Sequence, residues 1–168
     1  TKALITDGGS TKRDVIAAAR KALGKGVSRF VPAHPIAGAE KSGAAAASAE
    51  LFKARRVVIT PLEENAAKDI STVESAWKSC GASVSRMNAE EHDAVLATVS
   101  HLPHLLAFAF FSAVAKQPSG QDFLALAGPG FRDFTRIAAS DPKVWRDILI
   151  SNREELLAQS KVFQRNLH

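Results

Sequence analysis

The sequence predicts an α/β region followed by an all-α region, with the boundary near residue 88. Short apolar runs rich in β-branched residues alternate with segments of helical periodicity in the first half. After Asn88 the strand pattern disappears and only helical patterns remain. With 168 residues and 46% hydrophobic content, the chain is long enough to bury a core, as one domain or as two small ones.

Strands and helices are expected to alternate in the first half. The expected strands are ALIT (3–6), SRFV (28–31), RVVIT (56–60) and ASVSRM (82–87). The helical patterns are TKRDVIAAARKAL (11–23), an alanine-rich segment near 44–53, and NAAKDISTVESAWKSC (65–80), which Gly81 should end. Repeated strand–helix–strand units predict crossover connections and a largely parallel sheet.

The second half is expected to be helical throughout. The helix after Asn88 is apolar on most faces, so we expect it to be buried, and Pro103 should bend or break it. A short helix is expected at 131–139, and a last helical stretch at 140–167 has Ser140 or Asp141 as its cap. The apolar run at 102–115 is too short to span a bilayer comfortably, so no membrane association is expected.

Charge and cysteine content limit the classes of function. A net charge of +5 makes nucleic acid a partner to consider, but the basic residues are spread out and balanced by 17 acids. Mild positive charge suits small anions equally well, and no nucleic-acid partner is expected. The single cysteine, Cys80, excludes an internal disulfide and fits a reducing compartment. Because no secretory signal pattern is present either, we expect the protein in the cytoplasm.

Two candidate catalytic side chains are expected at neighbouring strand ends. Pro35 favours an extended backbone at His34, just past the expected strand 28–31. Ser10 follows the strand 3–6, after Gly8 and Gly9, which allow close backbone approach. Ligands of open parallel sheets bind beyond the carboxyl ends of strands, so this hydroxyl and imidazole should share one sheet edge. Alternatively, Ser10 only caps the next helix and His34 is an ordinary loop histidine.

Further candidates lie in the helical half. SHLPH places His101 and His104 on one helix face, but no carboxylate stands at a ligand spacing, so no metal is expected. Arg132 and Arg136 also share a helix face, an arrangement that suits a carboxylate-bearing ligand. The alternative for these arginines is a solvated basic face in which Asp133 pairs locally.

Four longer motifs occur in order over nearly the whole chain. They are TDGGSTK (6–12), HPIAGAEKSG (34–43), EEHDAVLATVSHLPHLLAFAF (90–110) and GPGFRDFTRIAASDPKVWRDI (128–148). Together they resemble the prephenate/arogenate dehydrogenase family of tyrosine biosynthesis. The resemblance implies that residues 1–88 are the C-terminal portion of a Rossmann-type dinucleotide-binding domain, without its glycine-rich βαβ unit. Residues 89–168 would then be a helical substrate-binding and dimerisation domain, so that the expected assembly is a homodimer.

The resemblance also implies an oxidoreductase that decarboxylates prephenate or arogenate to 4-hydroxyphenylpyruvate or tyrosine, with hydride transfer to NAD or NADP. His34 matches the family's catalytic histidine, Ser10 the serine that orients it, and Arg136 the arginine that binds a substrate carboxylate. Arg132 stands where family members often carry Lys. The expected substrate-binding residues are Arg136, His101, His104, Glu40, Lys41, Ser42, Arg132 and Trp145, and the expected cofactor-binding residues are Asp7, Gly8, Gly9, Ser10 and Pro35.

Two other functions stay open from the sequence. One is a non-catalytic, truncated dimerisation fragment that retains part of an α/β domain. The other is a related β-hydroxyacid dehydrogenase, an enzyme class that usually relies on a helix-borne lysine. A loop histidine carries the expected chemistry here, which disfavours the second alternative.

Overall fold

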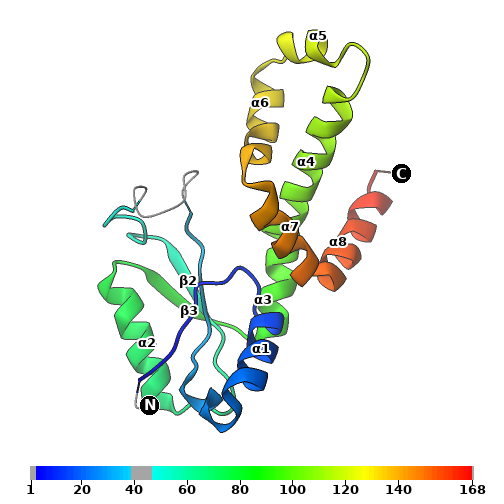
Figure 1. Ribbon diagram of the computed structural model, residues 1–168. Coiled ribbons are helices and arrows are strands. Elements are labelled where there is room, and N and C mark those ends of the chain that lie inside the picture. Colours follow the sequence, from blue (N-terminus) through cyan, green and yellow to red (C-terminus); the bar gives the residue numbers. More distant parts are fainter. Residues whose placement is uncertain (1–2, 39–46, 168) are drawn as a thin grey trace. The chain divides into compact units, whose positions relative to one another are not determined.

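Two compact units make up the chain, Thr1–Asp93 and Ala94–His168 (Figure 1). The computed structural model describes residues 3–38 and 47–167. The first unit contains the sheet, and the second is helical. An α/β region followed by an all-α region was the predicted fold class, and it is confirmed.

The first unit is built on a three-stranded sheet with the order β1–β2–β3. Its strands are β1 (Ala33–Pro35), β2 (Arg56–Ile59) and β3 (Ser83–Arg86). β2 and β3 pair in parallel, whereas β1 pairs antiparallel with β2. The prediction of a largely parallel sheet is therefore wrong for β1. A parallel pair needs a crossover, usually a helix, but residues 49–54 form turns. Of the helix expected near 44–53, residues 44–46 lie outside the described residues, and residues 47–53 are not helical.

The two remaining expected strands are reduced to a single bridge. Ile5 pairs in parallel with Phe30, and residues 24–29 form a 3₁₀ helix, η1 (Gly24–Arg29), instead of the start of a strand. Pro32 has no amide to donate, which limits strand pairing beyond this bridge. As a result His34 lies inside β1 and not, as predicted, past the end of a preceding strand.

Helices α1 (Arg13–Leu23) and α2 (Ala67–Ser79) flank the strands in Figure 1. Both helices agree with the sequence prediction to within two residues. α2 packs Val73 and Trp77 against the sheet, and α1 places Ile16 in a second apolar cluster. The first cluster comprises Val31, Ala33, Val57, Ile59 and Val73, and the second comprises Ile16, Val27, Phe30 and Leu62.

One long helix, Ala89–Ala115, begins in the first unit and forms the centre of the second. It consists of α3 (Ala89–Leu96), a π-helical segment η3 (Ala97–His101) and α4 (Leu102–Ala115). Pro103 was expected to bend or break it. The helix does not break, because the wider π turn lies directly before the proline that lacks an amide. Length and composition would let this helix cross a membrane, but core helices pass the same test. In the helical unit it packs against α5, α6 and α8.

Shorter helices follow α4 in the helical unit. They are α5 (Gly120–Ala125), α6 (Pro129–Thr135), the 3₁₀ helix η4 (Arg136–Ala139), α7 (Pro142–Ser151) and α8 (Arg153–Arg165). Asp141 caps α7 by accepting hydrogen bonds from the amides of Lys143 (2.8 Å) and Val144 (3.3 Å), as predicted. The last helical stretch divides at Asn152, where α7 ends and α8 begins.

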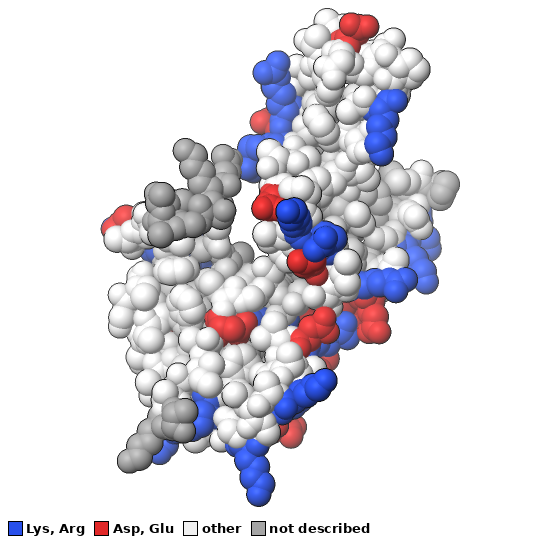
Figure 2. All heavy atoms as spheres, in the orientation of Figure 1, with Lys and Arg blue, Asp and Glu red and all other residues white. Residues whose placement is uncertain are grey.

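Burial of the long helix is less complete than its composition predicts. Within α4 only Leu102 and Ala107 are buried, and Phe110 and Phe111 are 44% and 40% exposed. The expectation of a buried helix is therefore wrong for the chain by itself. Lys and Arg side chains on the face shown in Figure 2 are spread among Asp and Glu and do not gather into one basic patch.

Candidate active site

Three buried polar side chains, those of His34 in β1 and of His92 and Asp93 in α3, form a hydrogen-bonded chain. The Nδ1 atom of His34 lies 2.8 Å from Nε2 of His92, and Nδ1 of His92 lies 2.8 Å from Oδ1 of Asp93. His92 is 0% and Asp93 1% exposed, and His34 is 8% exposed. The two imidazole rings meet edge to face with their centroids 5.0 Å apart. The orientation of the His34 ring is therefore fixed by a histidine and a carboxylate of α3.

Asp93, the last residue of the first unit, also caps the N-terminus of helix α1. Its carboxylate accepts hydrogen bonds from the backbone amides of Lys12 (2.8 Å) and Arg13 (3.0 Å). Burial favours the neutral carboxyl, but the hydrogen bonds from His92 and these amides outweigh it and hold the pKa of Asp93 below its ordinary value. The alternative that Ser10 caps this helix is wrong, because α1 begins later, at Arg13, and a distant carboxylate fills that place.

The loop before α1 is fastened to β1 by Asp7 and Lys12. Asp7 accepts hydrogen bonds from the amides of Gly9 (2.8 Å) and Ala33 (2.9 Å), and the Nζ atom of Lys12 lies 2.5 Å from Asp7 Oδ2. Lys12 Nζ also donates to the carbonyl of Ala33 (2.7 Å). Burial lowers the pKa of Lys12, against the opposing effect of Asp7. Asp7, expected to contact a cofactor, thus uses both oxygens to fix the backbone next to His34.

These contacts bring the expected loop of Gly8, Gly9 and Ser10 beside β1. A Cβ atom on Gly8 would stand 3.6 Å from Pro35 Cδ, and one on Gly9 would come within 2.9 Å of an Asp7 oxygen. Position 9 therefore requires glycine as long as Asp7 braces the loop. Among the described residues Ser10 Oγ makes no hydrogen bond, and its role as an orienting group stays a prediction.

A second group of predicted residues comes together in the helical unit. His101 is 1% exposed, and its Nδ1 accepts a hydrogen bond from the side-chain amide of Asn152 (3.1 Å). His104 donates from Nδ1 to the carbonyl of Ser100 (2.9 Å) and stacks on Trp145, with ring centroids 3.4 Å apart at 13°. The two histidines are thus positioned by hydrogen bonds and packing from η3, α7 and the start of α8.

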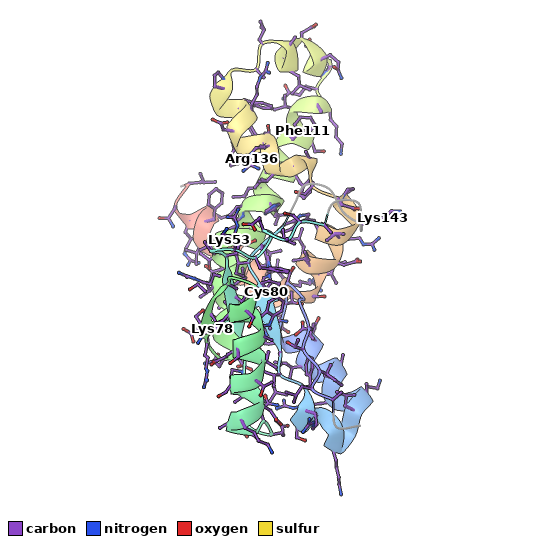
Figure 3. The ribbon with its side chains drawn as sticks, turned by 90° about the vertical axis from the view of Figure 1, so that its left-hand side faces the viewer. Lys53, Lys78, Cys80, Phe111, Arg136 and Lys143 are labelled. Carbon is purple, nitrogen blue, oxygen red and sulfur yellow. The ribbon has the colours of Figure 1, made fainter. Side chains whose placement is uncertain are left out.

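Arg136 lies near His104 in this unit. Burial, and in addition the positive charge of Arg136, lowers the pKa of His104, so that its imidazole is kept neutral. Figure 3 labels Arg136 at the start of η4. Arg132 is on α6 and donates from Nε to the carbonyl of Ala127 (3.2 Å). No ion pair joins Asp133 to either arginine in the described part of the chain, which disfavours the local pairing considered from the sequence.

Glu40, Lys41 and Ser42 lie outside the described residues. Sequence reasoning gave no role to His92, Asp93 or Asn152, each of which has a partner that is distant in the chain. Among the described residues no group of three or more His, Cys, Asp or Glu side chains is placed to hold a metal ion.

Two family models together match almost the whole chain. The first is described as "Prephenate dehydrogenase, nucleotide-binding domain" and matches residues 1–86. The second is described as "Prephenate dehydrogenase, dimerization domain" and matches residues 88–168. The chain belongs to the prephenate dehydrogenase family. The family expected from the four sequence motifs is therefore confirmed.

Similar proteins and structures agree with this assignment. The chain is 38% identical over 156 residues to cyclohexadienyl dehydrogenase of Zymomonas mobilis, covering 92% of this chain and 53% of that protein. It is 39% identical over 158 residues to prephenate dehydrogenase of Bacillus subtilis, covering 92% of this chain and 42% of that protein. The chain thus spans about half the length of the curated relatives it matches.

Solved structures of the family have the same fold. Prephenate dehydrogenase from Aquifex aeolicus, in complex with hydroxyphenyl propionate and NAD+, matches with a TM-score of 0.88 and 39% identity over 98% of this chain and 57% of that one. Synechocystis arogenate dehydrogenase matches with a TM-score of 0.81 and 26% identity, over 98% and 59% of the two chains.

Proposed function

We propose that the protein oxidatively decarboxylates prephenate or arogenate, with hydride transfer to NAD+ or NADP+. The observation that carries the proposal is the site around His34, in a chain of the prephenate dehydrogenase family. Its imidazole is held from Nδ1 by His92 and Asp93 and stands beside a glycine-rich loop. The names of the relatives, which include prephenate, cyclohexadienyl and arogenate dehydrogenases, support this choice of substrates.

His34 would act as the proton acceptor. It accepts a hydrogen bond from the ring hydroxyl of the substrate and takes its proton as the carbon bearing that hydroxyl loses hydride. Loss of carbon dioxide then makes the ring aromatic, giving 4-hydroxyphenylpyruvate from prephenate or tyrosine from arogenate. This role requires a neutral imidazole, because an imidazolium has no lone pair to accept the proton.

The residues of the first unit fit the nicotinamide end of a dinucleotide. Gly8 and Gly9 leave the backbone of their loop accessible beside Pro35, and Asp7 and Lys12 hold that loop in place. When bound, the dinucleotide supplies the hydride acceptor. Ser10 lies in the same loop and would help to orient the substrate hydroxyl.

The helical unit would contribute recognition of the substrate. Arg136 is exposed and not neutralised by Asp133, so its guanidinium can bind a carboxylate in the bidentate manner typical of arginine. His101, His104 and Trp145 form an ordered set of rings in the same unit, suited to a small cyclic ligand. The family resemblance implies that Glu40, Lys41 and Ser42 would also contact the substrate.

A homodimer through the helical unit is part of the proposal. The match to a dimerisation domain supports it, and so do the large apolar side chains that the unit leaves exposed. These include Phe110, Phe111, Phe123, Leu126 and Phe134. We also place the protein in the cytoplasm, for which its exposed free Cys80 is suited.

The test is an assay of the full-length protein with prephenate and with arogenate, each combined with NAD+ and with NADP+. Formation of the reduced dinucleotide should depend on one of the two substrates and should not occur with a panel of β-hydroxyacids. Replacing His34 with Asn should lower kcat by roughly 10²–10⁴-fold, the usual contribution of a positioned acid or base. KM should change much less, and an unchanged melting temperature would show that the fold is retained. Turnover close to that of the unmodified protein would refute the assignment of His34.

A further inference from the structure

In the hydrogen-bonded chain His34–His92–Asp93, Asp93 determines which atom is the donor at each contact. Asp93 is held as a carboxylate by the amides of Lys12 and Arg13 and can only accept hydrogen bonds. The Nδ1 atom of His92, 2.8 Å from that carboxylate, must therefore carry a proton. Because His92 is fully buried, this contact determines which of its nitrogens bears the hydrogen.

The proton on Nδ1 of His92 also determines the direction of the hydrogen bond to His34. In a neutral imidazole one nitrogen donates and the other accepts, so Nε2 of His92 is an acceptor. It lies 2.8 Å from Nδ1 of His34, which must then be the donor of this hydrogen bond. The remaining nitrogen of His34, Nε2, is left with a lone pair. An acceptor at this position is what the proposed deprotonation of the substrate hydroxyl requires.

We propose that His92 and Asp93 are positioning residues that fix His34 in the tautomer with hydrogen on Nδ1, so that Nε2 serves as the proton acceptor. The inference rests on the proposed role of His34, and it adds two residues to which the family resemblance gave no role. It also explains why the carboxylate is placed at the N-terminus of α1. There the two amides, the positive end of the helix dipole and the guanidinium of Arg13 (Nε 3.6 Å from Oδ2) keep it ionised.

The decisive variants replace His92 in two ways. In His92→Gln the side-chain NH₂ can donate to Asp93 while the carbonyl oxygen accepts from His34, so the direction of the chain is preserved. In His92→Leu neither contact can form, and the tautomer of His34 is no longer fixed. We expect His92→Gln to retain kcat within about tenfold, and His92→Leu to lose roughly 10²–10⁴-fold with a smaller change in KM.

A second pair of variants tests the carboxylate. Asp93→Asn removes the group that accepts without donating, and Glu91→Gln, on the exposed side of the same helix, is the control with the same change in net charge. Asp93→Asn should lower kcat, because an amide at this position can donate as well as accept and no longer fixes the proton on Nδ1 of His92. The other charged groups around the pair, Arg13 and the Lys12–Asp7 ion pair, are unchanged in both variants.

NMR measures the tautomer of His34 directly, without an assay of enzyme activity. In the full-length protein labelled with ¹⁵N in its histidine rings, NMR should show a protonated Nδ1 and an unprotonated Nε2 for His34 at neutral pH. The same pattern should persist in His92→Gln and be lost in His92→Leu. A proton on Nε2 of His34 in the unmodified protein would overturn the inference, as would equal kcat values for His92→Gln and His92→Leu. If the tautomer is as stated but neither prephenate nor arogenate is oxidised, the proposed function fails and the positioning chain stands.

Discussion

Replacing Lys12 with Met tests how the loop beside His34 is held. The ammonium group of Lys12 is completely buried and bridges Asp7 (2.5 Å) and the carbonyl of Ala33 (2.7 Å). Methionine fills a similar volume but cannot donate a hydrogen bond. The variant would therefore leave the Asp7 carboxylate without its counter-charge and the Ala33 carbonyl without this donor.

The expected loss of stability follows from the remaining contacts. Breaking a buried ion pair by removing one partner costs about 3–5 kcal/mol. Asp7 keeps its two amide donors and its side chain is 20% exposed, so the loss should lie at the lower end of that range. For a chain of this size, about 3 kcal/mol corresponds to a fall in melting temperature of about 6–12 °C.

The assay is thermal unfolding followed by circular dichroism, with Lys21→Met as the matched control. Lys21 is an exposed residue of the same helix, α1, and its replacement should change the melting temperature by little. A double-mutant cycle with Asp7→Asn should show coupling between positions 7 and 12. Equal melting temperatures for Lys12→Met and Lys21→Met would refute the argument that this ion pair fastens the loop.

Two further predictions concern the helical unit. The pKa of His104 is lowered from its ordinary value of 6.5 by burial and by Arg136, so its contribution to stability is complete above pH 6.5 and is lost as the pH falls through the lowered pKa. The melting temperature should fall between pH 7.5 and pH 5, and His104→Gln should reduce that slope; an identical slope would contradict the shift. Phe111, labelled on α4 in Figure 3, is 40% exposed, and Phe111→Glu should weaken a dimer through this unit on the order of 10²-fold, because a carboxylate would be buried there. Analytical ultracentrifugation measures this change, with Ser71→Glu on α2 as the control of equal charge, and an unchanged association constant would argue against α4 as part of the interface.

Local signals explain which elements the sequence could predict. The periodic apolar residues of α2 predict a helix, and the β-branched run of β2 predicts a strand, without reference to distant residues. Gly81, with φ +82°, follows the end of α2 where the sequence predicted it. The antiparallel pairing of β1 could not be derived in this way, because it depends on the path of the connection between β1 and β2. The π turn before Pro103 likewise depends on how the packed helix accommodates a missing amide.

The candidate site divides in the same manner. The sequence singles out His34 and the glycine loop as candidates because prolines and glycines are local markers. It singles out His104 and Arg136 because a helix brings residues three or four apart onto one face. Asp93 was not found, because a carboxylate next to a histidine on an amphipathic helix is indistinguishable from a solvated residue until the fold brings α1 to it. Asn152 was missed for the same reason, since its partner, His101, is 51 positions away.

The hydrogen bond from the amide of Lys12 to Asp93 connects positions separated by 81 residues. At a synthesis rate of about 5–20 residues per second, roughly 4–16 s pass on the ribosome between the emergence of the first turn of α1 and that of the carboxylate that completes it. Until then this turn has only water for its unpaired amides. Closure of the α/β unit is therefore a late event in translation, and the arrangement behind His34 forms only when the nascent polypeptide has entered the helical half.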